Sequence, residues 1–223
     1  MNRIYVADIN NIIDKEAFDY WYNQMPSRRQ AKIDAYKPQK SKLLSLAAGI
    51  LVKKALENEG ILNYEFREGS AGKPYIIGYD NLFFNLSHSG EKAIIAVSDG
   101  EVGIDIEKNK DFNRSLAEFV FDENERAIVE SLSDDKSKLY TALWTAKESI
   151  MKFYGKGISM EPKKIHLDID SECNIKIRHV EGEYAFDKLY LLHRELGDYQ
   201  ITVCSKGDNF GKTTITDVFD ICQ

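Results

Sequence analysis

The chain has 223 residues, of which 43% are hydrophobic and 30% charged, and its formal net charge is −6. This length and composition allow a buried core, in one domain or in two small ones, and exclude an intrinsically disordered chain. The negative net charge argues against general binding to nucleic acid or to an anionic membrane. Any recognition of phosphate must therefore come from a local cluster of Lys, Arg and His side chains.

The sequence predicts neither a membrane span nor a disulfide framework. Its longest strongly apolar run, residues 43–52, is too short to cross a bilayer. Residues 1–8 lack the apolar core of a signal peptide and predict a first strand. The cysteines at 173, 204 and 222 are odd in number and too widely spaced for a disulfide or zinc pattern. We therefore expect a cytoplasmic protein with reduced, packing cysteines.

A small basic turn follows the first predicted strand. Pro26 and Ser27 favour a helix start there, and Arg28, Arg29 and Lys32 lie in the first turns of that helix. These cations could line a solvated helix face, or they could clamp an anion.

Two further groups of polar residues lie in the first half. Residues 41–59 predict a helix that contains Ser45, which is either a tolerated small residue or a ligand. A later apolar strand, residues 82–86, runs directly into Ser87 and His88. Ligand-contacting side chains are often placed at such strand ends, although a lone histidine is more often structural.

Residues 102–107 alternate strictly between apolar and other side chains. As a strand, this stretch turns its three apolar residues to one face and Gly103, Asp105 and Glu107 to the other. Two carboxylates about 4 Å apart repel by roughly 1 to 4 kcal/mol, which a bound Mg²⁺ ion would remove. A neighbouring glycine lets a phosphate approach closely. The alternative is a strand end with ordinary surface acids.

The pattern breaks at residues 108–113, where we place the boundary between two halves. Asp122 and Glu125 then form a capping box at the start of a helix predicted for residues 123–132. The strongest helix follows at residues 137–154, with an apolar stripe at a spacing of 3.6 residues.

A second row of side chains on that helix is polar. Trp144, Glu148 and Lys152 are each separated by four residues, so they share a face, and Lys147 is adjacent in sequence. An intrahelical ion pair between Glu148 and Lys152 is the alternative interpretation.

The remaining sequence predicts short strands that build a sheet, with structural histidines at 166, 179 and 193. Residues 91–98 resemble residues 198–205 further along the chain. This similarity indicates an internal duplication, which would place the carboxylate strand in a cleft between two halves.

Four motifs occur in the order and spacing of the Sfp-type 4′-phosphopantetheinyl transferases, a family that the sequence resembles over nearly its whole length. They are Gly72-Lys73-Pro74, FNLSHS at residues 84–89, VGIDIE at residues 102–107 and WTAKESIMKFYGKG at residues 144–157. The resemblance implies an α+β fold of two similar halves related by a pseudo-twofold, with coenzyme A and Mg²⁺ held between them.

The resemblance also implies a reaction and a division of labour. Residues 1–107 would hold the adenine and 3′-phosphate of coenzyme A, and residues 108–223 would form the carrier-protein side. The phosphopantetheine arm would be transferred to a serine of an apo acyl or peptidyl carrier protein, with release of adenosine 3′,5′-bisphosphate. We expect a monomer that binds neither nucleic acid nor membrane.

Carried over position by position, the resemblance assigns the reaction centre. Asp105, Glu107 and Glu148 would hold Mg²⁺ against the diphosphate of coenzyme A. Lys152 would neutralise charge on the leaving phosphate, and Lys147 would aid phosphate binding. Glu148, directly or through a metal-bound water, is the candidate base for the serine proton.

Contacts to coenzyme A are implied for residues of the first half. They are Ser87 and His88 at the adenosine phosphate, Arg29, Lys32 and Ser45 at the 3′-phosphate, and Lys73 and Pro74 on the adenine. Relatives often carry Lys at the position of Arg29, and Arg28 is the alternative contact there.

Two other functions fit part of this pattern. A metal-dependent nuclease could use Asp105, Glu107 and a lysine, but it would need a broad basic groove, which the net charge of −6 argues against. A non-catalytic carrier-binding module is the other, and the complete set of acids and Lys152 argues against it. The sequence leaves the carrier open between fatty-acid, polyketide and peptide synthases.

Overall fold

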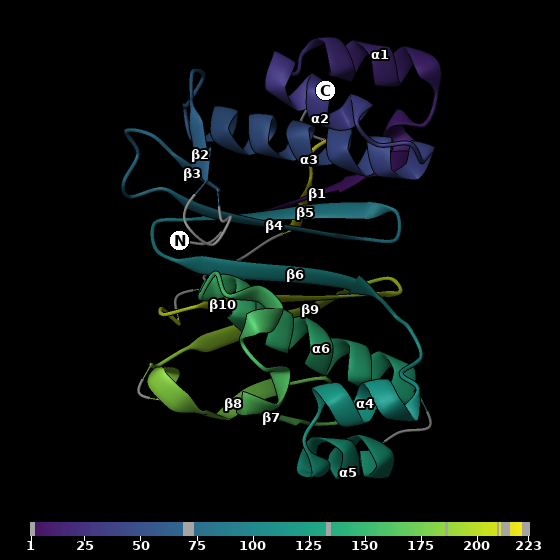
Figure 1. Cartoon of the computed structure of the whole chain (residues 1–223), viewed down its shortest axis with the longest axis vertical. Helices are drawn as coiled ribbons and strands as arrows, with labels where there is room; N and C mark the ends of the chain where they lie inside the picture. The colour runs from purple at the N-terminus through teal and green to yellow at the C-terminus, as the bar shows by residue number, and fades with distance from the viewer. Residues whose placement is uncertain are drawn as a thin grey trace.

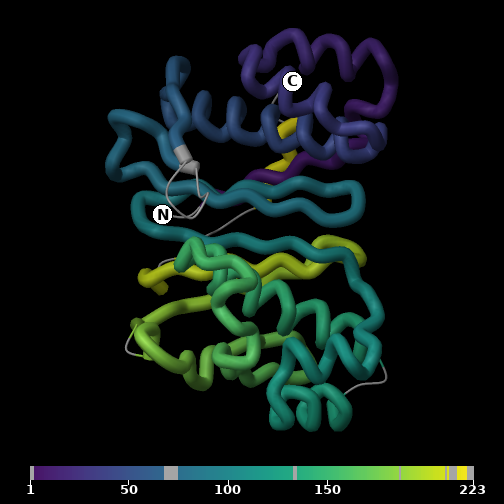
Figure 2. Tube along the Cα trace, in the orientation of Figure 1, coloured from purple at the N-terminus to yellow at the C-terminus, as the bar shows by residue number. Residues whose placement is uncertain are grey.

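The computed structural model describes residues 3–68, 74–132, 135–185, 187–208, 210 and 215–219, which form two α+β halves stacked along the long axis of the molecule (Figure 1 and Figure 2). The helices are α1 (Lys15–Asn23), α2 (Ser27–Asp34), α3 (Gln39–Asn58), α4 (Arg114–Val120), α5 (Glu123–Leu132) and α6 (Lys136–Phe153), with short 3-10 helices η1 (Ile9–Ile12), η2 (Gly157–Ser159), η3 (Pro162–Lys164) and η4 (Gly182–Tyr184). The strands are β1 (Arg3–Asp8), β2 (Phe66–Glu68), β3 (Pro74–Ile76), β4 (Phe83–Ser89), β5 (Lys92–Ser98), β6 (Val102–Lys108), β7 (Ile165–Ile169), β8 (Ile175–Val180), β9 (Tyr190–Leu196), β10 (Tyr199–Ser205) and β11 (Ile215–Asp217).

The first half packs α3 against a sheet with the strand order β11-β1-β5-β4. In α3, apolar side chains recur at helical spacing, and Leu43, Ile50 and Leu51 are buried in the core beneath it. The apolar run of β5 is buried as well, because it lies between β1 and β4 and under α3. The strong helix and the buried strand therefore define one hydrophobic core.

The second half packs α6 against a sheet with the order β6-β10-β9, and the β7–β8 pair, α4 and α5 complete it (Figure 1). The predicted capping box is confirmed at the start of α5. The Asp122 N–H donates to Glu125 Oε2 at 2.8 Å, and the Glu125 N–H donates to Asp122 Oδ1 at 2.7 Å. At the start of α6, the Lys138 N–H donates to the Asp135 carboxylate.

The two sheets repeat one arrangement. The order β1-β5-β4 in the first half matches β6-β10-β9 in the second, with antiparallel pairing throughout. Phe83 pairs with Ser98 in the first hairpin, and Tyr190 pairs with Ser205 in the second. Tyr190 follows Phe83, and Ser205 follows Ser98, at the same interval in sequence that separates residue 91 from residue 198. The α+β fold of two similar halves is thereby confirmed.

The halves meet through the apolar faces of their sheets. Ile4, Ile94 and Ala96 from the first sheet contact the side formed by Val102, Ile104, Ile106, Ile201 and Val203 from the second. The edge strands β4 and β6 lie next to one another along this seam. There the Ile104 N–H donates to Asn85 Oδ1 at 2.9 Å, and the Lys108 N–H donates to Ser89 Oγ at 3.1 Å. The polar end of β4 is therefore held beside the carboxylate strand.

The sheets do not follow the division of the chain at residue 107. Strand β6 pairs with β10, and β11 pairs in parallel with β1 in the first half. Val218 is fully buried in the core of that half. The prediction that the later strands build one sheet is wrong, because β7 and β8 pair only with each other among the described strands. None of the described helices is both long and apolar enough to cross a membrane.

Candidate active site

The site is built where β6 meets α6. Gly103, Asp105 and Glu107 point toward α6, whereas the apolar residues between them fill the seam with the first half. A Cβ atom on Gly103 would lie 2.0 Å from the Ser149 carbonyl oxygen and 2.4 Å from the Phe153 nitrogen. The missing side chain therefore lets the two backbones approach closely enough to bring both acids against the helix.

Asp105 lies at the centre of a buried charged triangle. The residue is 3% exposed, and Oδ1 accepts hydrogen bonds from Lys152 Nζ at 2.6 Å and from Ser87 Oγ at 2.7 Å. Lys152 Nζ also lies 2.8 Å from Ser87 Oγ. Burial raises the pKa of Asp105, and the Lys152 ammonium opposes that shift. The other oxygen, Oδ2, is buried without a hydrogen-bond partner among the described residues.

Glu107 is the second acid of β6 and is more exposed than Asp105. Its oxygens accept hydrogen bonds from Ser89 Oγ at 2.7 Å and from Trp144 Nε1 at 3.3 Å, and Lys110 Nζ lies 3.2 Å away. Ser89 and Lys110 were missed in the sequence. The alternation of β4 could have indicated Ser89, since it shares a face with Ser87.

Glu148 adds the third acid from the opposite element. It lies one helical turn before Lys152 on α6 and is partly buried. Burial first, and then the negative charge of Asp105, raises the pKa of Glu148 to about 7. The negative charges of Asp105 and Glu107 both raise this pKa, so Glu148 lies within electrostatic reach of the two acids on β6. The ligand oxygens of the three acids do not all lie within 4.8 Å of one another.

These residues suit a hard divalent cation. The carboxylate oxygens are the ligand type that Mg²⁺ prefers, and Asp105 Oδ2 has no partner among the described residues in its buried position. Glu148 has no cationic partner strong enough to keep its pKa low. A cation among the three acids would satisfy the orphaned oxygen and relieve their repulsion.

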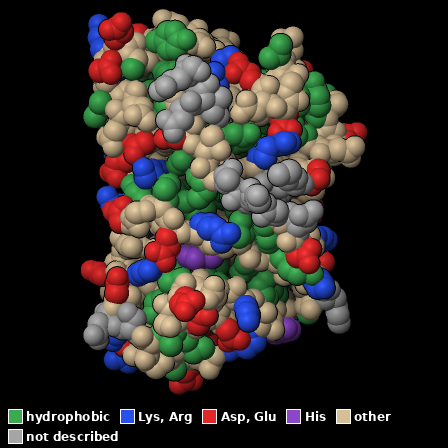
Figure 3. Space-filling model, turned by 180° about the vertical axis from the view of Figure 1, so that it is seen from behind, with side chains coloured by type: hydrophobic (Ala, Val, Ile, Leu, Met, Phe, Trp, Pro, Cys, Tyr) green, Lys and Arg blue, Asp and Glu red, His purple; other side chains and the backbone are tan. Residues whose placement is uncertain are grey.

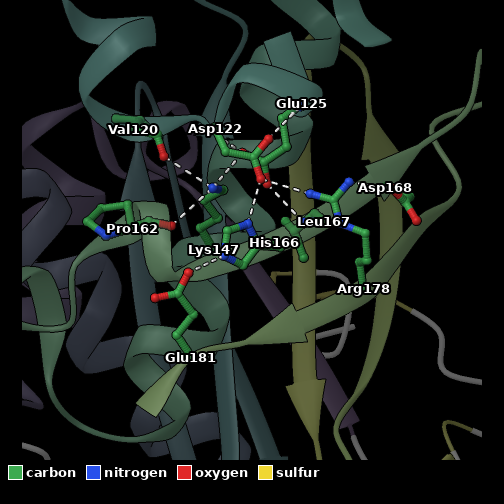
Figure 4. A network of polar contacts seen from close by, with 10 residues as sticks. All are labelled: Val120, Asp122, Glu125, Lys147, Pro162, His166, Leu167, Asp168, Arg178 and Glu181. Atoms are coloured by element: carbon green, nitrogen blue, oxygen red, sulfur yellow. Dashed lines mark hydrogen bonds and ion pairs between the residues drawn. The ribbon is translucent and has the colours of Figure 1, made fainter. Parts of the chain in front are cut away.

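Lys147 does not reach this site, which corrects its predicted role in phosphate binding. Its side chain is fully buried on another side of α6, and Nζ donates to Glu125 Oε2 at 2.7 Å, to the Val120 carbonyl at 3.1 Å and to the Pro162 carbonyl at 3.0 Å (Figure 4). Successive residues on a helix point about 100° apart, so Lys147 cannot share the face of Glu148. It ties α6 to α5 and to the η3 segment.

The predicted coenzyme A contacts lie on the first half. Arg29 on α2 contacts the position of Gly49 on α3, one turn after Ser45. Burial lowers the pKa of Arg29, and the Ser45 hydroxyl is buried without a hydrogen-bond partner in the described structure. Lys32 is exposed on the same helix as Arg29.

Ser87 and His88 point to opposite faces of β4. Ser87 faces the seam and binds Asp105 and Lys152, whereas His88 is exposed on the side that carries α3. Lys73 and the side chain of Pro74 lie outside the described part of the structure.

Comparison with known proteins finds relatives of this chain. The model of the 4′-phosphopantetheinyl transferase superfamily matches residues 101–204. The chain is 32% identical over 167 residues to the 4′-phosphopantetheinyl transferase gsp of Aneurinibacillus migulanus, covering 72% of this chain and 68% of that protein. It is 25% identical to the transferase ffp of Bacillus subtilis, covering 93% and 94% of the two chains. A solved complex of ACPS with CoA from Chronobacterium ammoniagenes aligns with 47% of this chain at 20% identity and a TM-score of 0.38.

The chain belongs to the 4′-phosphopantetheinyl transferase superfamily. The matched region contains both strand acids, Glu148 and Lys152. It is an enzyme of the 4′-phosphopantetheinyl transferase type, and the coverage of the ffp relative extends over both halves.

Proposed function

We propose that this transferase moves the 4′-phosphopantetheine arm of coenzyme A to a serine of an apo acyl or peptidyl carrier protein, in a Mg²⁺-dependent reaction that releases adenosine 3′,5′-bisphosphate. The observation that carries the proposal is the meeting of Asp105 and Glu107 from β6 with Glu148 and Lys152 from α6. Three acids and one lysine around a buried seam provide charge of both signs where a diphosphate would react.

Asp105, Glu107 and Glu148 are the residues that would hold Mg²⁺. When bound, the ion would screen the negative charge of the diphosphate and polarise its oxygens. Ser87 and Ser89 support this role, because their hydroxyls donate to Asp105 and Glu107 and fix the direction of each carboxylate.

Lys152 would neutralise charge on the leaving bisphosphate. Its ammonium is anchored to Asp105 and Ser87 at the end of α6, and 24% of its side chain is exposed. A phosphate oxygen arriving from solvent can therefore share this ammonium without a rearrangement of the helix.

Glu148 is the candidate base that takes the proton from the carrier serine. A carboxylate with a pKa of about 7 is a good proton acceptor, and about half of it is in the charged form at neutral pH. Transfer of the serine proton to a Glu148 oxygen would accompany formation of the new oxygen–phosphorus bond, while the bond from the phosphorus to the bisphosphate breaks.

Coenzyme A would lie across the seam, with its adenosine end on the first half. Arg29 and the Ser45 hydroxyl, which has no partner among the described residues, support a 3′-phosphate site between α2 and α3, near the exposed Lys32. His88 on the α3 side of β4 would extend this site, and Lys73 with Pro74 would pack on the adenine. Ser87, which donates to Asp105, would contact the adenosine phosphate next to the three acids.

The surface favours this proposal over a nuclease. On the face shown in Figure 3, Lys and Arg side chains are interspersed with Asp and Glu outside the grey areas, and no continuous basic groove crosses it. Together with the net charge of −6, this argues against a duplex-binding surface.

The test is incubation of the protein with a panel of apo carrier proteins, coenzyme A and Mg²⁺, followed by mass spectrometry. The expected result is a carrier that gains one phosphopantetheine at its serine, with stoichiometric adenosine 3′,5′-bisphosphate. Carrier protein that binds without gaining mass would instead support a binding module. Cleaved nucleic acid in a parallel assay would support the nuclease.

A further inference from the structure

A second set of metal-ligand side chains lies away from the reaction centre, at the far edge of the second sheet. Cys173 comes from the turn between β7 and β8, and His193 and Glu195 come from β9. One ligand atom of each lies within 4.8 Å of those of the other two. Strand β10 separates this set from Asp105, so it does not belong to the carboxylate cluster.

We propose that Cys173, His193 and Glu195 bind a borderline-soft divalent cation, Zn²⁺ in particular, and so fasten the β7–β8 turn to β9. Thiolate, imidazole and carboxylate together are a ligand set for Zn²⁺, whereas Mg²⁺ prefers oxygen ligands alone. Three protein ligands leave a fourth position for water. The proposal does not depend on the transferase reaction.

The backbone at Cys173 is unusual. Its φ angle is +59°, and no other described residue except glycine has a positive φ. This conformation is uncommon for residues with a Cβ and costs of order 1 kcal/mol or more. The turn is held by the Cys173 N–H, which donates to the Asp170 carbonyl at 3.0 Å. The thiol is thereby kept buried beside β9, with 2% of the residue exposed.

Both ring nitrogens of His193 have partners on β10. One ring nitrogen lies 3.0 Å from Thr202 Oγ1 and the other 3.0 Å from Gln200 Oε1. Burial lowers the pKa of His193 to about 4, so the ring is neutral at pH 7 and one nitrogen carries a lone pair. Gln200 Oε1 is an acceptor, so Nε2 carries the proton and Nδ1 faces the Thr202 hydroxyl. A cation on Nδ1 would displace that hydroxyl and leave the Nε2–H bonded to Gln200, which is the usual support of a metal-binding histidine.

Glu195 provides the entry to the site. Its side chain is 40% exposed and pairs with Lys138 Nζ at 2.8 Å. An incoming cation would displace this ammonium from the carboxylate, and the Cys173 thiol would release its proton to solvent.

The experiment is titration of the full-length protein with Co²⁺ in the presence of excess Mg²⁺, which keeps the carboxylate site occupied. Thiolate ligation gives a charge-transfer absorption band that oxygen ligands alone do not produce. Zn²⁺ should abolish this band by displacement, and competition with a chelator then gives its affinity. The matched control is Cys222→Ser, which removes a cysteine outside the proposed set.

The expected results differ among the variants. Cys173→Ser should lose the band and bind Zn²⁺ at least about 100-fold more weakly, while Cys222→Ser should behave as the parent protein. Glu195→Gln, at an exposed position, should weaken binding by about 10-fold. Lys138→Met should tighten binding roughly 2- to 5-fold, because an exposed ion pair no longer competes for Glu195.

The tightening by Lys138→Met separates a true site from general damage to the fold, since destabilised variants do not gain affinity. A parent protein without a band, or a band that survives in Cys173→Ser but disappears in Cys222→Ser, would overturn the proposal. An unchanged or weaker affinity in Lys138→Met would overturn the assignment of Glu195.

Discussion

The two halves of this molecule share one strand order, but they differ in the side chains that lie between sheet and helix. Tyr5 pairs with Ile95 in the first sheet and Asp105 with Thr202 in the second, and Thr202 follows Ile95 at the interval of the internal repeat. The register therefore makes Tyr5 the counterpart of Asp105, and Ala7 the counterpart of Glu107. Tyr5 and Ala7 belong to the apolar core under α3, whereas both acids face α6.

The helices differ in the same way. On α3 the single polar side chain buried among the described residues is Ser45, whereas α6 buries Thr141, Thr145, Lys147 and Ser149. Burying polar groups requires partners: Thr145 has one on β10 and Lys147 one on α5, while Thr141 and Ser149 donate to carbonyls of α6 itself. The comparison shows that α3 is packed mainly through apolar side chains, whereas buried charged contacts are concentrated on α6.

The largest difference between the halves is expected at the counterpart positions of β1 and β6. Asp105→Ala should lower kcat/KM by about 1,000-fold, equivalent to about 4 kcal/mol, because it removes both a metal ligand and the anchor of Lys152. Tyr5→Phe, the matched change in the first half, should retain activity near the parent value. Transfer kinetics and circular dichroism check both, and an active, folded Asp105→Ala protein would refute the assignment.

The buried ion pair of the second half has no equivalent among the described residues of α3. Lys147→Met should lower the free energy of unfolding by about 3 kcal/mol or more, since Glu125 is left charged and fully buried without its cation. Adding Glu125→Gln should recover part of that loss, because the double variant buries no charge. Urea unfolding measures both, and a stable single variant would show that the pair contributes little.

Two glycines at the helices differ in their surroundings: Gly103 on β6 packs against α6, whereas Gly49 lies on α3 itself. Gly103→Ala should destabilise the protein by about 1 to 3 kcal/mol, because its Cβ would overlap the backbone of α6 at Ser149 and Phe153. Gly49→Ala on α3 meets the flexible side chains of Met25 and Arg29 instead, at 2.6 and 3.4 Å. Its unfolding free energy should change by less than about 1 kcal/mol, since helix propensity offsets the crowding. Equal losses in thermal unfolding would contradict this distinction.

The smallest expected effect is the pH dependence of Mg²⁺ binding, which comes from the protonation of Glu148 on α6. Glu148 has a raised pKa of about 7, so it is mostly protonated at pH 6 and mostly charged at pH 8. Mg²⁺ affinity should therefore rise about 10-fold over this interval, since the ion binds the charged form. Calorimetric titration checks this, with Glu148→Gln as the control that removes the pH dependence. A flat profile in the parent protein would exclude Glu148 as the titrating group.

Much of this arrangement could be predicted from periodicity. The sequence predicted helices at residues 41–59 and 137–154, close to the observed α3 and α6, because their apolar residues recur at helical spacing. The alternation in β6 correctly separated the acids from the apolar face, and the repeat that relates residues 91–98 to residues 198–205 was confirmed by strand register.

Other features depend on contacts that one sequence does not specify. Strand β11 pairs with β1 across almost the entire chain, so its local pattern could not identify its sheet. Helix α4 was missed because its seven residues are too few for a helical period to stand out, although the Asn113 side chain caps it. Helix periodicity already turns Lys147 away from Glu148, but the sequence did not show that Glu125 would be buried there as its partner.

The pairing of β11 with β1 also orders the events of biosynthesis. The outer edge of β1 stays open until residues 215–217 leave the ribosome, after every described element of the second half has been made. Phe219 then stacks edge-on against Trp21, and the Val218 N–H donates to the Val6 carbonyl at 2.9 Å. A nascent chain that stops after β10 would expose a strand edge and an unfilled core, which makes it a substrate for chaperones and proteases.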